Sequence, residues 1–515
     1  MMNLKIDPLF KRYWILFLFL SIKIALNIFI INPAYELHRD EFLYLDQANH
    51  LATGYISNQP FTAWLAAIIH SIGDKIFWIR FFPVLFGTIT LVVVWLIIEE
   101  LGGEIYSKIL VLCALIFSVI IRLDILFQPY AFDILAFTLI FYFCIQYIKT
   151  ERPKWFVCLV LTVVLGFYNK YNILFLLSGL MGGTLLTGNR KIFINKLFYF
   201  GLLIGLILIL PNIIWQINRN FPILHHINAL ENTQLDHVDR VAFLKDQILF
   251  FLGSLPLIIA VFFAFVFYKP FKAYRIIGLT YLIVIIIYTL LRAQSYYAFG
   301  LYPTLIAFGG VYLEKILSKV WKLLIVPVVV LLNFLLFFSV LKFIVPVLSP
   351  TDIVENKNKF EAFGLLKWDG QNHQLPQDFA DMLGWKEMAD KSLLAYNMIP
   401  QSEKDQTIIF CDNYGEAGAL NYYNRKVMQE AYSLNADYIY WLPHLKSIKN
   451  MLVIGKKPSD EIINMFSDYK LVGIVENEYA REKNTGIYIL KGATIEFTDY
   501  FYRITEEHKK KFDIF

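Results

Sequence analysis

Eleven runs of mainly apolar residues follow one another through the first two thirds of the chain. A membrane-spanning helix needs about 20 such residues in succession, and most of the runs approach this length. The runs at 155–168 and 172–187 are shorter, and they predict one broken hairpin or two tilted half-spans. The predicted spans are approximately 13–31, 81–98, 108–122, 130–148, 155–168, 172–187, 197–215, 247–267, 274–291, 297–313 and 323–345.

Basic residues are unevenly distributed between these spans. When the N-terminus is placed in the cytoplasm and the spans alternate, the inner segments hold 16 Lys and Arg residues and the outer segments nine. Cytoplasmic loops of membrane proteins carry such an excess. We therefore expect a cytoplasmic N-terminus and, with eleven spans, a C-terminal region outside the cytoplasm.

The outer segments differ from the inner ones in length and composition. Inner segments are short and basic, whereas the outer segments 32–80 and 216–245 are long and rich in polar and aromatic residues. Ordering a long loop has an entropic cost, so long loops usually have a function. We therefore expect the chemistry on the outer face of the membrane.

The pattern changes after Pro346, where the composition becomes that of a soluble domain. Strands are predicted at 407–411, 451–454, 471–475 and 486–490, and helices near 414–424 and 459–468. The expected fold is an α-helical polytopic membrane protein with a small extracytoplasmic α/β domain. The membrane domain is assigned residues 1–346, including both long outer segments, and the α/β domain residues 347–515.

Composition supports a membrane protein and excludes other classes. Hydrophobic residues make up 57% of the 515 residues and charged residues 17%, whereas a soluble domain has about 25% charged residues. Residues 1–350 carry a net charge of +10 and residues 351–515 a net charge of −5, without a dense basic run that would predict nucleic-acid binding. The four cysteines form no C-x-x-C pair, so neither a disulfide scaffold nor a thiolate metal site is predicted.

Two adjacent carboxylates, Asp40 and Glu41, follow the first span. A carboxylate held near a low-dielectric surface has a raised proton affinity and can act as a general base. The apolar residues from 41 to 52 have helical spacing, so we expect the pair to open an amphipathic helix that lies along the membrane. The alternative is that the two acids only stabilise the positive N-terminal end of this helix.

Further polar residues recur where predicted spans meet the outer face. Asp133 lies near the start of the span at 130–148, and Lys170 interrupts an apolar stretch. A lysine at this depth is costly unless an anion pairs with it, and a phosphate is a natural partner. The alternative is that Lys170 extends to the membrane interface without a ligand.

The outer segment at 216–245 and the turn after residue 291 add basic and aromatic candidates. His225 and His226 could ligate zinc, but adjacent residues in a helix rarely face one metal, and no third ligand is evident. We therefore predict no metal ligand, although the pattern does not decide whether a divalent ion takes part. The aromatic residues of the turn could also form an interfacial belt. The predicted substrate-binding residues are Glu41, Asp133, Lys170, His225, His226, Arg240, Arg292 and Tyr297.

These carboxylates, cations and phenols fall on the same face of the membrane under one topology. A one-sided group of this kind favours a reaction on a phosphate-bearing lipid. The sequence contains no P-loop and no G-x-G-x-x-G, H-E-x-x-H or G-x-S-x-G motif in a suitable context, so a soluble nucleotide substrate is not predicted.

Several segments resemble the membrane glycosyltransferases of the GT-C class, in particular the group that contains protein O-mannosyltransferases and lipid A aminoarabinose transferases. The resemblance covers roughly residues 35–310. The segments that carry it are Asp40-Glu41, Gly54-Tyr55, Pro60, Arg80-Phe81, Gly87, Asp133, Lys170-Tyr171, Trp215-Gln216, Phe221-Pro222, His225-His226, Ser295-Tyr296-Tyr297 and Tyr302-Pro303.

The resemblance implies an enzyme of the cell (inner) membrane that takes a sugar from a polyprenyl-phosphate donor with inversion at the anomeric carbon. Asp40 matches the loop acid that acts as a base or orients the acceptor. Lys170 matches a basic residue near the donor phosphate, and Tyr297 matches a phenol that contacts this phosphate.

The sequence also departs from both groups. The aminoarabinose transferases have an acidic-basic pair before the loop proline, where this chain has Asn58-Gln59-Pro60. Residues 351–515 do not resemble the sugar-binding repeats of the mannosyltransferases. The acceptor therefore stays open and is a glycan, a lipid or a protein.

We expect Asp40 and Lys170 to share one pocket, in which the cation stabilises the leaving phosphate and the carboxylate activates the acceptor hydroxyl. The expected partners are the lipid-linked donor, the acceptor and membrane lipids. The alternative function is a transporter or flippase of lipid-linked sugars, although transporters usually contain inverted repeats, which this sequence lacks. A structural membrane protein with an interaction domain is a third class, and it would not need converging acids and a lysine.

Overall fold

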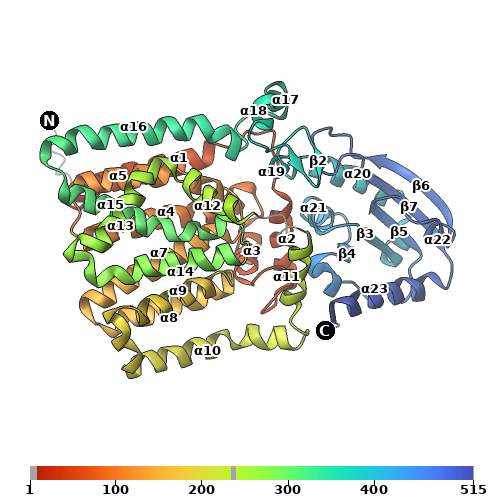
Figure 1. Ribbon diagram of the computed structural model, residues 1–515. Coiled ribbons are helices and arrows are strands. Elements are labelled where there is room, and N and C mark those ends of the chain that lie inside the picture. Colours follow the sequence, from red (N-terminus) through yellow and green to blue (C-terminus); the bar gives the residue numbers. More distant parts are fainter. Residues whose placement is uncertain (1–7, 234–238, 514–515) are drawn as a thin grey trace, which may run out of the picture. The chain divides into compact units, whose positions relative to one another are not determined.

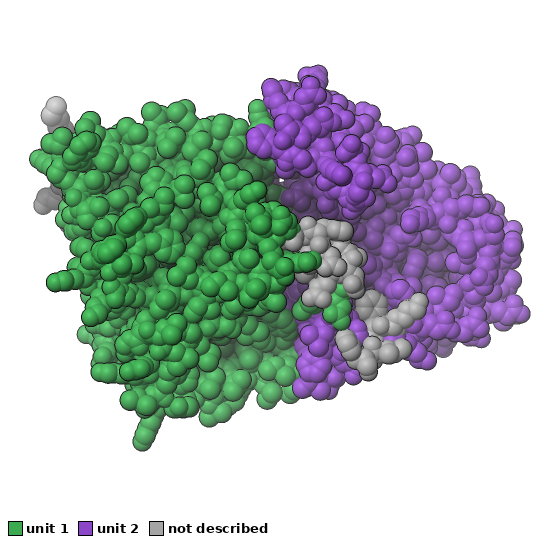
Figure 2. Space-filling model, in the orientation of Figure 1, with its two compact units in different colours: residues 1–30, 80–214, 227–345 green, residues 31–79, 215–226, 346–515 purple. Residues whose placement is uncertain are grey.

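The structure is a computed structural model that describes residues 8–233 and 239–513. The chain forms two compact units, which Figure 2 shows in different colours. Unit 1 comprises residues 1–30, 80–214 and 227–345, and unit 2 comprises residues 31–79, 215–226 and 346–515. The contacts thus group most of the first outer segment, which the sequence analysis assigned to the membrane domain, with the C-terminal residues. Part of the second outer segment, at 234–238, lies outside the described residues.

Each of the eleven predicted spans corresponds to a helix or to two successive helices (Figure 1). A helix satisfies its own backbone hydrogen bonds, which is the condition for crossing lipid. The helices are α1 (Pro8–Phe29), α4 (Ile76–Glu100), α5 (Ile105–Ile116) with α6 (Ile120–Leu123), α7 (Tyr130–Thr150), α8 (Pro153–Asn169), α9 (Ile173–Leu185), α10 (Lys196–Ile217), α12 (Arg240–Leu249) with α13 (Leu255–Phe267), α14 (Arg275–Leu290), α15 (Tyr302–Ile316) and α16 (Lys319–Ile344).

Within the described residues, five helical segments are long and apolar enough to cross a membrane: Ile76–Glu100, Tyr130–Thr150, Lys196–Ile217, Lys269–Leu290 and Lys319–Ile344. A sixth candidate is the pair Arg240–Leu249 and Leu252–Phe267, which is bent by 65°. Shorter apolar helices of 10–17 residues account for most of the other runs. The structure therefore confirms a helical membrane domain but not the count of eleven full spans.

Small residues allow the helices of unit 1 to pack closely. α9 packs against α14, where a Cβ atom at Gly179 or Gly183 would lie 2.9 Å from the carbonyl oxygen of Thr280 or Ile276. Small residues four positions apart are typical of helix contacts in membranes, because they let two backbones approach. The short run at 172–187 is thus a helix with its own partner, and residues 170–172 separate it from α8.

Unit 2 contains a five-stranded mixed sheet with the strand order β4-β3-β5-β7-β6. β3 pairs in parallel with β4 and β5, and β7 pairs in antiparallel with β5 and β6. The strands are β3 (Thr407–Cys411), β4 (Ala431–Ser433), β5 (Asn450–Gly455), β6 (Phe466–Ile474) and β7 (Gly486–Ala493). All four strands predicted from the sequence are present, and so is the helix near 414–424.

Helices cover both faces of this sheet (Figure 1). On one face, Ile408, Val453 and Leu490 pack with Phe497 and Phe501 of α23 (Phe497–Asp513). On the other face lie α20 (Trp385–Asn397) and α21 (Tyr414–Asn424), and α2 (Arg39–Asp46) packs on α21. Both faces of β3 and β5 are covered, which explains why the sequences of these strands are nearly continuous hydrophobic runs.

The remaining elements are short. Those of residues 47–301 are η1 (Gln47–His50), α3 (Phe61–Ile72), η2 (Gly188–Ile194), α11 (Pro222–Thr233), η4 (Leu252–Ser254), η5 (Lys269–Tyr274) and η6 (Ser295–Leu301). Those of the C-terminal part are α17 (Pro350–Glu355), α18 (Lys357–Glu361), β1 (Lys367–Trp368), β2 (Gln371–Asn372), α19 (Gln377–Ala380), η7 (Gln401–Gln406), η8 (Ala436–Tyr440) and α22 (Asp460–Ile463).

Candidate functional site

The two predicted loop acids lie in the first turn of α2. His38 is the N-cap: its Nδ1 accepts a hydrogen bond from the backbone N–H of Asp40 (3.2 Å), and the Glu41 carboxylate accepts one from the backbone N–H of His38 (2.7 Å). This capping box satisfies backbone donors that the helix itself leaves unpaired. Glu41 is fully buried. Its position matches the alternative reading of the sequence, in which the acid stabilises the helix end.

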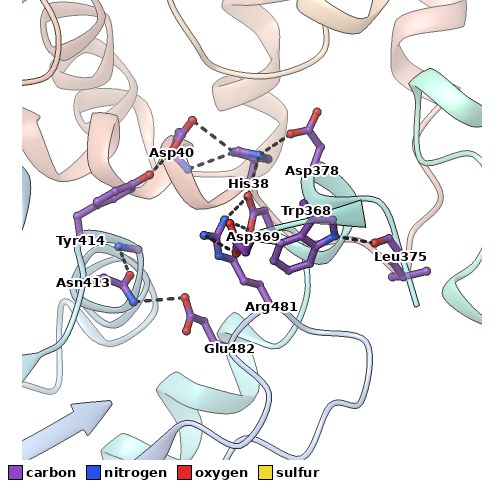
Figure 3. Close-up of polar contacts among 12 residues, drawn as sticks. His38, Asp40, Trp368, Asp369, Leu375, Asp378, Asn413, Tyr414, Arg481 and Glu482 are labelled. Atoms are coloured by element: carbon purple, nitrogen blue, oxygen red, sulfur yellow. Dashed lines mark hydrogen bonds and ion pairs between the residues drawn. The ribbon is translucent and has the colours of Figure 1, made fainter. Parts of the chain in front are cut away.

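Asp40 has different surroundings from its neighbour. Its Oδ1 accepts a hydrogen bond from the phenol of Tyr414 (2.7 Å), and its Oδ2 lies 3.9 Å from Nδ1 of His38. Figure 3 shows the carboxylate between these two side chains. The Asp40 side chain is 32% exposed, so it can meet both solvent and a substrate.

A group of charged side chains surrounds Asp40 within unit 2. Nε2 of His38 lies 4.0 Å from Asp378 and 3.9 Å from Asp381. Arg481 donates two hydrogen bonds from Nη1 to the Asp381 carboxylate, at 3.1 and 3.2 Å. Burial raises the pKa of Asp381, and the neighbouring His38, Arg481 and Arg39 oppose this effect. Acidic and basic side chains therefore both lie around the candidate base.

Trp368 lies at one side of this group (Figure 3). Its indole Nε1 donates to the carbonyl of Leu375 (3.1 Å), and its ring stacks on His373 with 3.4 Å between the ring centroids. The Arg481 guanidinium lies 5.5 Å from the Trp368 ring, within the range of a cation–π interaction. Arg481 is thus held by an acid and by an aromatic ring.

The apolar side of α2 packs against protein, whereas the sequence predicts an amphipathic helix along the membrane. Phe42, on its apolar side, packs against Trp385, Tyr422 and Tyr423 of α20 and α21. Residues 41–46 are all buried. The apolar spacing of residues 41–52 correctly predicts a helix. The apolar side of this helix packs against protein, because α20 and α21 provide a large aromatic face.

The second group of candidate residues lies in unit 1. Lys170 follows α8, and its ammonium lies over the rings of Tyr297 (3.7 Å), Tyr130 (4.4 Å) and Tyr296 (5.5 Å). The Nζ atom is buried, and within the described residues it has no hydrogen-bond partner. Cation–π contacts stabilise the charge, but they leave all three N–H donors of the ammonium unused.

Asp133, in the first turn of α7, lies near this lysine and acts on it through its charge. Its Oδ2 accepts a hydrogen bond from Nδ2 of Asn172 (2.6 Å), while its Oδ1 has no partner within the described residues. Asn172 also donates to the carbonyl of Tyr297 (3.1 Å) and accepts a hydrogen bond from Tyr288 (2.6 Å). This network fixes the acid, the amide and the turn that carries Tyr297.

The two predicted arginines lie near the C-terminal end of α14. Arg240 donates hydrogen bonds to the carbonyls of Thr289 (3.2 Å) and Leu290 (3.3 Å) at the end of this helix. Arg292 follows the helix with a left-handed backbone conformation, φ 52°. Arg240 therefore has a structural contact in the described structure, and its role with substrate stays a prediction.

The paired histidines lie on α11. His225 is half-buried in unit 2, and the side chain of His226 lies outside the described residues. No three His, Cys, Asp or Glu side chains within the described residues form a group that could hold a metal ion. Participation of a divalent ion stays as open as the sequence left it.

The structure thus brings Asp133, Lys170 and Tyr297 together in unit 1, and it places Asp40 and Glu41 on α2 of unit 2. Sequence reasoning missed Tyr130, Tyr296 and Asn172, although each adjoins a predicted residue or motif. It also missed Tyr414, which is 374 positions from Asp40 and carries no local signal. A common pocket for Asp40 and Lys170, which belong to different units, stays a prediction.

Comparisons with known proteins agree with this fold. A family model described as dolichyl-phosphate-mannose-protein mannosyltransferase matches residues 57–215. Among proteins with a curated description, none matches the sequence.

Two solved structures of ArnT from Cupriavidus metallidurans match over nearly their whole length. The apo state has a TM-score of 0.61, and the form bound to undecaprenyl phosphate has a TM-score of 0.60. In both comparisons the sequences are 12% identical, and the alignment covers 93% of this chain and 98% of ArnT. The oligosaccharyltransferase AglB from Archaeoglobus fulgidus, in complex with an inhibitory peptide and a dolichol-phosphate, has a TM-score of 0.51 at 10% identity. It covers 86% of this chain and 70% of AglB. The chain therefore has the fold of the GT-C class membrane glycosyltransferases, as the resemblance of its sequence predicted.

Proposed function

We propose that this protein is a glycosyltransferase that moves a sugar from a polyprenyl-phosphate donor to an envelope acceptor, on the outer face of the membrane and with inversion. The observation that carries the proposal is the buried ammonium of Lys170. It has three aromatic rings around it and no hydrogen-bond acceptor within the described residues. A phosphate oxygen would complete it, because an ammonium is a strong point-charge binder of phosphate.

Asp133 suits this role as a second charge near Lys170. The charges of Asp133 and Lys170 sum to zero, so the pair places no net charge among the apolar helices when the donor is absent. When a lipid phosphate arrives, the ammonium can turn its free donors to the phosphate oxygens. Stabilising the negative charge that develops on the leaving phosphate is the usual contribution of such a cation to transfer.

In the proposed reaction, an acceptor hydroxyl attacks the anomeric carbon of the donor sugar. The bond from this carbon to the phosphate oxygen breaks, and its electron pair leaves with the lipid phosphate. Asp40 takes the hydroxyl proton, a role for which its partly exposed carboxylate is suited. Attack from the face opposite to the leaving phosphate inverts the anomeric carbon.

The structural relatives support a lipid-linked donor. One ArnT structure contains undecaprenyl phosphate, and the AglB structure contains a dolichol-phosphate and an inhibitory peptide. For this chain they support the donor class, while the sugar and the nature of the acceptor are open. The apolar helices of unit 1 offer a place for the lipid tail.

The test uses the full chain, purified in detergent and incubated with an envelope extract that supplies acceptors and with polyprenyl-phosphate sugars that carry a radiolabel in the sugar. We expect the wild type to move the label from the lipid to an acceptor and to release free lipid phosphate. Asp40→Asn should reduce turnover by a factor of about 100 or more, in line with the loss of a general base. Lys170→Met should reduce it by about 100- to 1,000-fold, in line with the loss of a cation at the leaving group.

Lys149→Met is the matched control, because Lys149 has an exposed ion pair with Glu100 at the other end of α7. It should retain wild-type turnover. An unchanged donor with the wild type would contradict the proposal, and movement of intact donor between leaflets of a vesicle would support the transporter alternative instead.

A further inference from the structure

We propose that Tyr414 of the C-terminal region is a positioning residue for Asp40, so that residues 346–515 take a direct part in sugar transfer. This inference rests on the proposed function, in which Asp40 takes the proton of the acceptor. Tyr414 itself touches neither reacting group in the proposal. It acts by holding one oxygen of the carboxylate and so fixing the orientation of this group.

The contact itself is well defined. The phenol of Tyr414 donates to Oδ1 of Asp40 at 2.7 Å, which is a good length for a bond from a hydroxyl to a carboxylate. The Arg39 guanidinium lies 4.4 Å from the centre of the Tyr414 ring, and this fixes the ring on its face. Both partners are therefore oriented before an acceptor arrives.

The packing of α2 on α21 sets the position of the pair. Gly415 and Gly418, one helical turn apart on α21, lie under α2: a Cβ atom at Gly418 would be 2.9 Å from Cβ of Phe42. The side chain of Asp46, at the other end of α2, accepts hydrogen bonds from Asn421 and Tyr438, both at 2.6 Å. Contacts at both ends of α2 therefore prevent the helix from sliding along α21.

The hydrogen bond has a geometric consequence for Asp40. It holds Oδ1 in one direction and so fixes the orientation of the carboxylate. Burial and the charge of Asp40 raise the pKa of Tyr414, so the phenol keeps its proton and remains a donor.

Other charged groups face Asp40 or its immediate partners. They are His38, Arg39, Asp378, Asp381, Arg481 and Glu482. A substitution of the Tyr414 phenol leaves each of them in place. A change in the activity of such a variant therefore reports the lost hydrogen bond.

The kinetic test is Tyr414→Phe in the full chain. Loss of one hydrogen bond to a charged group should lower kcat by roughly 10- to 100-fold, with little change in the KM for the donor.

Tyr423→Phe is the matched control. Tyr423 lies on the same helix and donates to another carboxylate of the same segment, Glu36 (3.1 Å). It should leave kcat near that of the wild type. Equal losses of kcat in both variants, or a loss in Tyr414→Phe that falls on the KM for the donor and not on kcat, would show a structural role only and overturn the proposal.

A second measurement is independent of turnover. A water-soluble carbodiimide modifies accessible carboxyl groups, and mass spectrometry of the peptide can follow the rate of its reaction with Asp40. We expect Asp40 to react faster in Tyr414→Phe, because one oxygen is no longer held by the phenol, and at the wild-type rate in Tyr423→Phe. An unchanged rate overturns the positioning role even if the wild type transfers sugar. A raised rate in a protein that transfers no sugar keeps the hydrogen bond's role and rejects the proposed function.

Discussion

Two lysines near apolar helices of unit 1 each have an acid nearby but differ in their hydrogen bonds. Lys23 on α1 forms a buried ion pair with Asp124 in direct contact, whereas Lys170 lies among aromatic rings and has no hydrogen-bond acceptor within the described residues, although Asp133 acts on it through its charge. An ionised group at membrane depth is costly and usually finds a partner. Because Asp124 accepts a hydrogen bond from Lys23 while Asp133 accepts none from Lys170, the unused donors of Lys170 favour a ligand there over a purely structural cation.

The ion pair of Lys23 leads to a prediction about stability. Asp124→Asn leaves the Lys23 ammonium buried without a counter-charge, so we expect a loss of about 3–5 kcal/mol in the free energy of unfolding. The hydrogen bond from Asn27 to the Asp124 backbone carbonyl (3.2 Å) does not depend on the acid and should persist. The thermal unfolding midpoint of the detergent-purified protein measures the change.

The double variant Lys23→Met with Asp124→Leu provides the control for this prediction. It removes both charges, so it should be more stable than either single variant, as for other buried ion pairs that are replaced by apolar residues. A double variant whose loss equals the sum of the two single losses would show that the charges do not interact.

At the scale of elements, the contact between α2 and α21 depends on the absence of a side chain at Gly418. A Cβ atom there would also lie 3.0 Å from the backbone carbonyl carbon of Phe42 and from the Tyr438 hydroxyl. We expect Gly418→Val to push α2 away and to destabilise the protein by about 1–3 kcal/mol, as overpacking usually does. The thermal midpoint and the rate of sugar transfer should both fall.

Gly473→Val on β6 is the matched control, because its Cβ atom would meet only Lys391 at an ordinary 3.5 Å. This variant should retain transfer. If Gly418→Val leaves the midpoint and the rate unchanged, the two helices are not held as closely as the structure describes.

The comparison between sequence and structure is also clearest at this scale. β3 and α21 begin and end where their local patterns predict, because strand composition and a capping box define them. The helix predicted at 459–468 is largely wrong: α22 covers only Asp460–Ile463, and β6 begins at Phe466. Pairing of β6 with β7 along its length outweighs the local helical spacing, and no local pattern contains that partner.

The same limit explains what could be predicted of the candidate site. Asp133 and Lys170 could be found because an ionised residue next to an apolar run is visible in the sequence. The Tyr414 contact of Asp40 joins residues that are 374 positions apart, and it follows from the packing of α2 on α21. Local patterns in the sequence therefore do not predict such a pair.

At the scale of the whole molecule, unit 2 is assembled from separate stretches of the chain. Glu36 accepts hydrogen bonds from the backbone N–H groups of Gly384 (3.2 Å) and Lys386 (2.8 Å). Asp437 accepts one from the backbone N–H of Ile56 (2.6 Å) and one from the side chain of Gln47 (2.8 Å). Residues 31–79 are therefore an integral part of unit 2, because these hydrogen bonds join them to residues more than 300 positions away.

This assembly predicts how stability depends on pH. Asp437 is fully buried, and burial raises its pKa from 3.8 to about 6, against the opposing effect of its hydrogen bonds to Ile56, Gln47 and Ser57. Between about pH 4 and pH 6 the folded protein holds a proton that the unfolded chain has released. The contribution of Asp437 to the free energy of unfolding is therefore highest below pH 4, falls by about 3 kcal/mol as the pH rises to about 6, and stays constant above it.

Thermal unfolding of the full chain in detergent at pH 4.5 and pH 7 tests this dependence. The wild type should have the lower midpoint at pH 7, because the charged carboxylate is then buried between residues 47–57 and η8. Asp437→Asn is neutral at both values, so it should lose part of this difference, although it is less stable overall because one amide N–H faces a donor. Asp468→Asn, at an exposed position of β6, should keep the full difference. If Asp437→Asn and Asp468→Asn respond to pH in the same way, Asp437 does not hold a proton in the folded state, and the assembly of unit 2 does not depend on its protonation.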